Sequence, residues 1–186
     1  MERPAPLHPA LRALPSVFSL LRLGCAVALA LSPREWWLAL VLAAGASDWI
    51  DGYTARRLRA TSWIGGLLDG FTDKAFVITA LLCFAADGLV AWWQVPLLLV
   101  RDVCVAAGVL VSALRRDADA FRQMDSRVFG KLATVLIFAF LATLLLWPAA
   151  RALHATLYGL GALISTAAGL DYIRTRFRRI TGRRAG

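Results

Sequence analysis

Residues 46–74 read ASDWIDGYTARRLRATSWIGGLLDGFTDK and carry four aspartates at the edges of long apolar runs: Asp48, Asp51, Asp69 and Asp73. The first pair is spaced i,i+3 and the second pair i,i+4, so each pair shares one face if its segment is helical. A short turn around residues 59–62 would make the two helices antiparallel neighbours. The stretch therefore predicts a helical hairpin whose carboxylates face one common pocket.

The rest of the chain is apolar to a degree that soluble proteins rarely reach. Of 186 residues, 59% are hydrophobic and 18% are charged, although the formal net charge is +9. Soluble domains carry roughly 25% charged residues. The basic residues also cluster between apolar runs that are long enough to cross a bilayer, whereas a nucleic-acid-binding surface would need them spread over one face. This composition excludes a soluble nucleic-acid-binding protein and indicates a membrane protein.

Six apolar runs predict an all-α integral membrane protein with six transmembrane helices. They cover about residues 14–31, 36 to the basic group at 56–59, 63–86, 89–114, 128–147 and 152–173. We expect a single domain over residues 1–186, with a short basic segment at 1–13 and an arginine-rich tail at 174–186. The three cysteines lie far apart within apolar runs, which is typical of small buried side chains and not of disulfides.

The distribution of basic residues predicts the orientation of the helices. Most of the 21 Lys and Arg residues precede the first run, join the second to the third, join the fourth to the fifth, or follow the sixth. Cytoplasmic loops retain Lys and Arg, so we expect both termini and the aspartate pocket on the cytoplasmic side of a multi-pass protein of the inner membrane. Five tryptophans would then lie in the opposite headgroup layer: Trp36, Trp37, Trp92, Trp93 and Trp147.

Four carboxylates in one pocket need a compensating charge. At about 6 Å and an effective dielectric constant near 20, each pair repels by roughly 3 kcal/mol. A purely oxygen ligand set favours Mg²⁺ or Mn²⁺ over zinc or copper, and four carboxylates can hold two such ions, as in phosphoryl-transfer enzymes. In the alternative reading the aspartates form salt bridges with Arg56, Arg57 or Lys74, while Gly66 and Gly70 form a helix-packing face.

Eight residues of this stretch resemble the signature of the CDP-alcohol phosphatidyltransferases at every specified position: Asp48, Asp51, Gly52, Ala55, Arg56, Gly65, Asp69 and Asp73. The six predicted helices and Gly130-Lys131 at the start of the fifth are similar to that family as well. The resemblance implies that Asp48, Asp51 and Asp69 hold two metal ions, while Asp73 completes the metal site and is the general base. It also implies that the other four signature residues surround the CDP-linked lipid.

By this resemblance the chain is an enzyme that moves a phosphatidyl group from CDP-diacylglycerol to a polar alcohol or lipid acceptor and releases CMP. Arg101, Lys131 and Arg174 are the predicted ligands of an acceptor phosphate. The pair Arg101-Asp102 looks like that of the CMP-forming cardiolipin synthases, which predicts phosphatidylglycerol as acceptor, with glycerol 3-phosphate as the alternative. In another reading Arg101 pairs with Asp102, and Lys131 and Arg174 snorkel to the membrane surface.

Other interpretations remain open at this point. A cation-binding transporter or a helical scaffold without enzymatic activity would also place acidic residues within apolar helices. The small residues Gly161, Ser165 and Gly169 predict close packing against a neighbouring helix or against a second subunit of a homodimer. The arginine-rich tail is expected to contact anionic membrane lipids.

Overall fold

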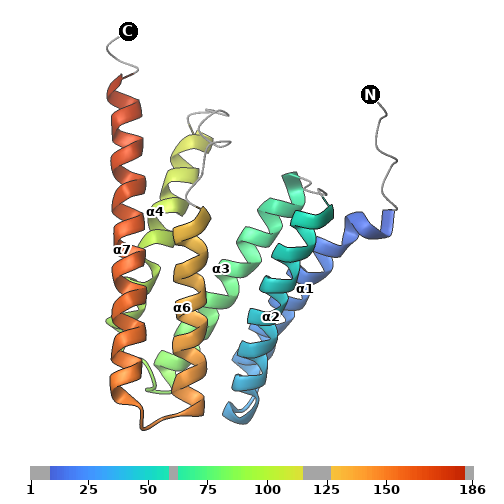
Figure 1. Cartoon of the computed structure of the whole chain (residues 1–186), viewed down its shortest axis with the longest axis vertical. Helices are drawn as coiled ribbons and strands as arrows, with labels where there is room; N and C mark the ends of the chain where they lie inside the picture. The colour runs from blue at the N-terminus through green and yellow to red at the C-terminus, as the bar shows by residue number, and fades with distance from the viewer. Residues whose placement is uncertain (1–8, 59–62, 115–126, 183–186) are drawn as a thin grey trace. The chain divides into compact units, whose positions relative to one another are not determined.

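The structure, a computed structural model, is built of helices and turns throughout the residues that it describes, and it has no strand among them. The backbone is described for residues 9–58, 63–114 and 127–182, and the side chains for 19–47, 50, 71–107, 132–171, 173 and 174. The helices are α1 (Pro9–Leu31), α2 (Trp37–Leu58), α3 (Trp63–Ala86), α4 (Gln94–Leu114), α6 (Arg127–Leu146) and α7 (Arg151–Gly182), with the short 3₁₀ helix η1 (Arg34–Trp36) between α1 and α2 (Figure 1). The all-helical prediction is confirmed.

Helix α4 begins later than the sequence predicted. The start was expected near residue 89, but a turn separates α3 from α4, and α4 starts at Gln94. Gly88 has a φ of 76°, which is the left-handed conformation that glycine adopts most easily. The N–H of Leu89 donates to the carbonyl of Phe84 (2.9 Å) and the N–H of Gly88 to that of Ala85 (3.1 Å). This pair of bonds is a Schellman ending, which stops α3 before the next apolar run begins.

Helix α7 continues further than the sequence predicted. Its expected end was residue 173, yet the helix extends to Gly182 through most of the arginine-rich tail. Arginine is a good helix former, and no proline interrupts this part of the chain. Within the described residues, the segment Arg151–Asp171 of α7 is the one long and apolar enough to cross a membrane, and Ser19–Leu31 and Leu132–Leu146 are shorter apolar segments.

The chain divides into two compact units, Met1–Cys83 and Phe84–Gly186. In the first unit α1 packs against α2, and the indole N–H of Trp37 donates to the carbonyl of Ser32 (3.1 Å) across the turn that joins them. Trp37 is buried by this packing, and its predicted place in the headgroup layer stays a prediction. The other four tryptophans expose more than half of their surface: Trp36, Trp92, Trp93 and Trp147.

In the second unit α7 packs against both α4 and α6. A Cβ atom built on Gly161 would lie 3.2 Å from Leu98 of α4, and one built on Gly169 would lie 3.3 Å from Val100. The residue numbers rise together along the two helices, so α4 and α7 run parallel. The small residues of α7 therefore pack against a neighbouring helix, which confirms the first of the two predicted roles for them.

Candidate active site

The four aspartates of the signature lie on two continuous helices of the first unit. Asp48 and Asp51 belong to α2, and Asp69 and Asp73 belong to α3, so the helical spacing of both pairs is confirmed. The side chains of Asp48, Asp51 and Asp69 lie outside the described residues. The same holds for the predicted ligands of the CDP-lipid: Gly52, Ala55, Arg56 and Gly65. Their contacts therefore stay predictions.

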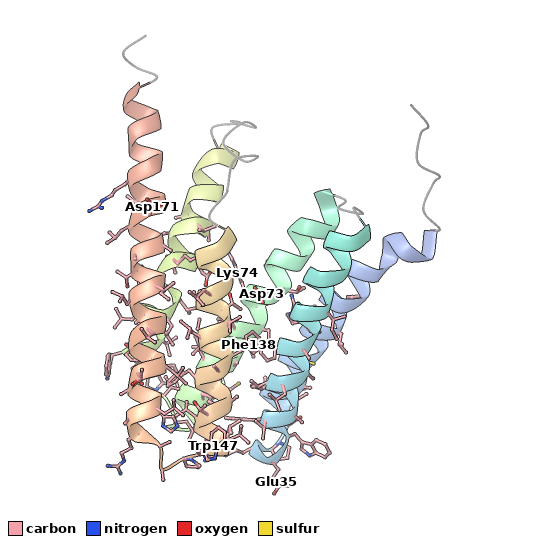
Figure 2. The ribbon with its side chains drawn as sticks, viewed as in Figure 1. Glu35, Asp73, Lys74, Phe138, Trp147 and Asp171 are labelled. Atoms are coloured by element: carbon pink, nitrogen blue, oxygen red, sulfur yellow. The ribbon has the colours of Figure 1, made fainter. Side chains whose placement is uncertain are left out.

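Asp73 is the signature aspartate whose side chain the structure describes. Its atom Oδ1 lies 4.0 Å from Nη1 of Arg22 in α1, and the side chain keeps 27% of its surface exposed. Arg22 itself is fully buried. In Figure 2 Asp73 lies on α3, far along the helices from Glu35, which marks the turn that joins α1 to α2. The ion pair thus lies about halfway along α1 and α3, well away from that turn.

The buried faces of α1 and α2 change from apolar to polar with increasing distance from the turn that joins these two helices. On α1 the buried residues nearest the turn are Cys25, Ala26 and Leu29, whereas Ser19 and Arg22 are the buried residues further away. On α2 the buried apolar residues are followed by Ser47, which directly precedes Asp48. Burial of polar groups is unfavourable unless partners compensate them, so polar residues gather where a site needs them.

Arg22 is the residue that sequence reasoning missed. Its position within an apolar run was visible, and a charged side chain in such a run needs a partner. The sequence did not reveal which carboxylate this partner is, since that depends on how α1 is rotated against α3. The salt-bridge reading of the aspartates did not name Arg22, whose guanidinium lies 4.0 Å from Asp73 Oδ1, and the side chains of Arg56 and Arg57 lie outside the described residues.

The donor atoms of the signature suit a hard divalent cation. Carboxylate oxygens are the preferred ligands of Mg²⁺ and Mn²⁺, and Asp73 combines a charged oxygen donor with partial exposure. Among the side chains that the structure describes, no group of three or more His, Cys, Asp or Glu residues could hold a metal. Three of the four predicted ligands lie outside that set. The chemistry of the four side chains and the helical spacing of the pairs fit the predicted metal.

Arg101, a predicted ligand of the acceptor, is half-buried on α4 and has its backbone tied to α7. The hydroxyl of Ser165 donates to the carbonyl of Leu98 (2.7 Å), and the N–H of Arg101 donates to the same hydroxyl (3.2 Å). A Cβ atom built on Gly169 would lie 3.5 Å from the Cα of Arg101. The packing of α7 therefore sets the position of Arg101.

The structure does not bring Arg174 to the contact between α4 and α7 where Arg101 lies. Ser165 faces α4, and Arg174 follows nine residues later on α7, which at about 100° per residue turns it to the opposite face of the helix. Its side chain is exposed, as the snorkelling interpretation requires. Lys131 belongs to α6, but its side chain lies outside the described residues. The predicted acceptor roles of Lys131 and Arg174 remain predictions.

Comparison with known proteins agrees with this arrangement. The model of the CDP-alcohol phosphatidyltransferase family matches residues 12–167, which include all four aspartates of the signature. A protein of Mycobacterium tuberculosis named "Putative cardiolipin synthase" is 34% identical over 125 residues, which cover 64% of this chain and 58% of that protein. The CDP-diacylglycerol–glycerol-3-phosphate 3-phosphatidyltransferase of Blochmanniella floridana is 32% identical over 98 residues, 50% of this chain and 52% of that protein.

A third relative is the CMP-forming cardiolipin synthase of Streptomyces coelicolor. It is 34% identical over 108 residues, which cover 57% of this chain and 48% of that protein. This chain thus spans about half the length of the curated relatives that it matches. Their names give cardiolipin as a product for two of them and glycerol 3-phosphate for the third.

Proposed function

Because the chain belongs to the CDP-alcohol phosphatidyltransferase family, we propose that it transfers a phosphatidyl group from CDP-diacylglycerol to a glycerol-containing acceptor and releases CMP. The observation that carries the proposal is Asp73, which lies on α3 at signature spacing, beside a fully buried arginine and with part of its surface accessible. A carboxylate in this setting has the charge and the access that a base in a membrane-facing site requires.

In the proposed reaction Asp73 accepts the proton of the acceptor hydroxyl. The freed oxygen attacks the phosphorus on the lipid side of the diphosphate, a new P–O bond forms, and the P–O bond to CMP breaks, so that CMP leaves with the electron pair. The side chains of Asp48, Asp51, Asp69 and Asp73 would hold Mg²⁺ or Mn²⁺, which when bound neutralises charge on the diphosphate. Gly52, Ala55, Arg56 and Gly65 would surround the cytidine and the diphosphate. Much of the catalysis would come from positioning.

We propose phosphatidylglycerol as the acceptor, so that the product is cardiolipin. Two of the relatives reported above are named as cardiolipin synthases, and the pair Arg101-Asp102 supports the same choice. Arg101 is tied through its backbone to α7 and would bind the acceptor phosphate. Glycerol 3-phosphate is the second candidate because the relative from Blochmanniella is named for that acceptor.

The family is membrane-associated, and we propose six membrane crossings with both termini and the aspartate site in the cytoplasm. Large apolar side chains are exposed on the helices of both units, including Leu20, Leu31, Val103, Val135 and Leu163. Such surfaces are typical of contact with lipid. The diacylglycerol chains of the donor would then reach the site from the bilayer.

The experiment that tests the function is an assay of the purified protein with CDP-diacylglycerol and parallel acceptors. Phosphatidylglycerol, glycerol 3-phosphate and inositol would be supplied separately, each with Mg²⁺, with Mn²⁺ and with a chelator, and the lipid product identified by mass spectrometry. We expect CMP and cardiolipin to form with phosphatidylglycerol when a divalent cation is present. Absence of CMP with every acceptor would contradict the enzyme and favour a cation transporter.

A further inference from the structure

Arg22 and Asp73 form a pair in which the two side chains differ strongly in exposure. The guanidinium of Arg22 is on α1 and has none of its surface exposed, whereas the carboxylate of Asp73 on α3 keeps 27%. A fully buried arginine cannot contact a substrate that enters from outside. Any effect of Arg22 on the reaction must therefore act through the groups that it touches.

The two carboxylate oxygens of Asp73 are not equivalent in this arrangement. Oδ1 is the oxygen that lies 4.0 Å from Arg22, and it is a buried atom. Because the side chain as a whole is partly exposed, its accessible surface belongs to its other atoms. We infer that Arg22 is a positioning residue that holds Oδ1 of Asp73 inside the first unit and so orients the exposed part of the carboxylate toward the acceptor hydroxyl or the metal. This inference rests on the proposed function of Asp73 as base.

The surroundings of the pair fit such a role. Ser19 lies one turn before Arg22 on the buried face of α1, and Thr72 directly precedes Asp73; both side chains are buried. Burial of a charged group is costly unless partners compensate it. Removal of one partner of a buried pair leaves an uncompensated charge, whereas removal of both does not. This asymmetry provides a test that is independent of catalysis.

The first test is kinetic and compares R22M, R22K and a control. We expect R22M to lower kcat about 100-fold, because a misplaced catalytic group loses roughly that factor, with the KM for CDP-diacylglycerol changed by less than about twofold. R22K keeps the charge and should recover part of the loss. The control is R34M, which removes an exposed arginine in η1 of the same unit and should leave kcat unchanged. A higher KM for CDP-diacylglycerol at unchanged kcat in R22M would overturn the inference.

The second test is a double-mutant cycle with D73N. If Arg22 acts through Asp73, R22M should reduce the residual activity of D73N by less than about threefold, since contacting residues are not additive. Thermal unfolding in detergent supplies a readout without activity. We expect R22M to unfold at a lower temperature than the wild type and R22M/D73N to recover part of the difference. Additive losses in activity, or no recovery in unfolding, would overturn the inference.

The two levels of proposal can fail separately. If the wild type releases no CMP with any acceptor, the proposed function fails, whereas the unfolding cycle still reports on the Arg22–Asp73 pair. If the wild type is active and R22M keeps the wild-type kcat, the positioning role fails and the proposed function stands.

Discussion

The two units of the chain bury polar side chains in different ways. In the first unit a charged pair, Arg22 and Asp73, links α1 to α3, and one of its members remains partly exposed. In the second unit the buried polar group between α4 and α7 is the neutral hydroxyl of Ser165, which bonds to the backbone of α4 on both sides. Both contacts join helices, but the first buries a charged pair with a partly exposed carboxylate, whereas the second buries a neutral hydroxyl.

The difference between the two buried groups distinguishes a residue that packs helices from residues that are candidates for catalysis. A hydroxyl between glycines lets two helices approach closely, and it both donates to and accepts from the backbone of α4. A buried arginine beside a partly exposed carboxylate is a costly arrangement for packing, because an apolar pair of the same volume would serve as well. The first unit therefore has the features of a reaction site, whereas the second unit supports a residue, Arg101, that we assign to binding.

The largest expected effect comes from Asp73. D73N keeps the shape of the side chain but removes the proton acceptor, so we expect kcat to fall about 1000-fold. The measurement is CMP release with phosphatidylglycerol as acceptor. If D73N kept normal turnover, Asp73 would not be the base, and the contrast between the two units would lose its functional meaning.

A matched control for D73N is D171N in the second unit. Asp171 is exposed near the end of the apolar segment of α7, where Figure 2 labels it. It lies outside the signature, and its replacement should change kcat by less than about twofold. An equal loss in both variants would indicate a general effect of charge on the protein and would contradict a specific role of Asp73.

Gly169 tests the packing side of the comparison. In G169L the new side chain would meet Val100 (3.3 Å), Cys104 (3.4 Å) and the Cα of Arg101 (3.5 Å) from its first carbon, so we expect overpacking to destabilise the protein by about 1–3 kcal/mol. The control is G159L on the same helix, where nothing lies within 4 Å of the built Cβ. Unfolding in detergent measures both. Equal shifts would show that the seam between α4 and α7 is not tightly packed.

Arg101 connects the packing of the second unit to the proposed reaction. R101M should raise the KM for the acceptor about tenfold, since a hydrogen bond to a charged group contributes roughly 1.5 kcal/mol. The KM for CDP-diacylglycerol should stay constant. R174M is the control, because Arg174 is exposed on the face of α7 opposite to α4. If R101M raised both KM values equally, Arg101 would be structural, and an acceptor effect of R174M would restore the predicted role of Arg174.

The sequence predicted the helices and the spacing of the aspartates because both depend on local periodicity. It did not predict the partner of Asp73, since the contact between Arg22 and Asp73 depends on the rotation of α1 against α3, which no local pattern specifies. It named Ser165 as a packing residue but left the partner open between a helix of the same chain and a second subunit. The hydrogen bond from Ser165 to Leu98 was likewise beyond a single sequence, because it joins residues far apart in the chain.

The smallest expected effect comes from Ser165 itself. S165A removes the hydroxyl that accepts from the N–H of Arg101 and donates to the carbonyl of Leu98, so we expect a loss of about 1 kcal/mol in the free energy of unfolding. The KM for the acceptor should rise by about twofold, because the backbone of Arg101 loses one restraint. The control is T156A, whose hydroxyl is exposed and bonds within α7 to Ala152. If S165A and T156A behaved alike, the hydroxyl would not position Arg101, and the second unit would contribute packing alone.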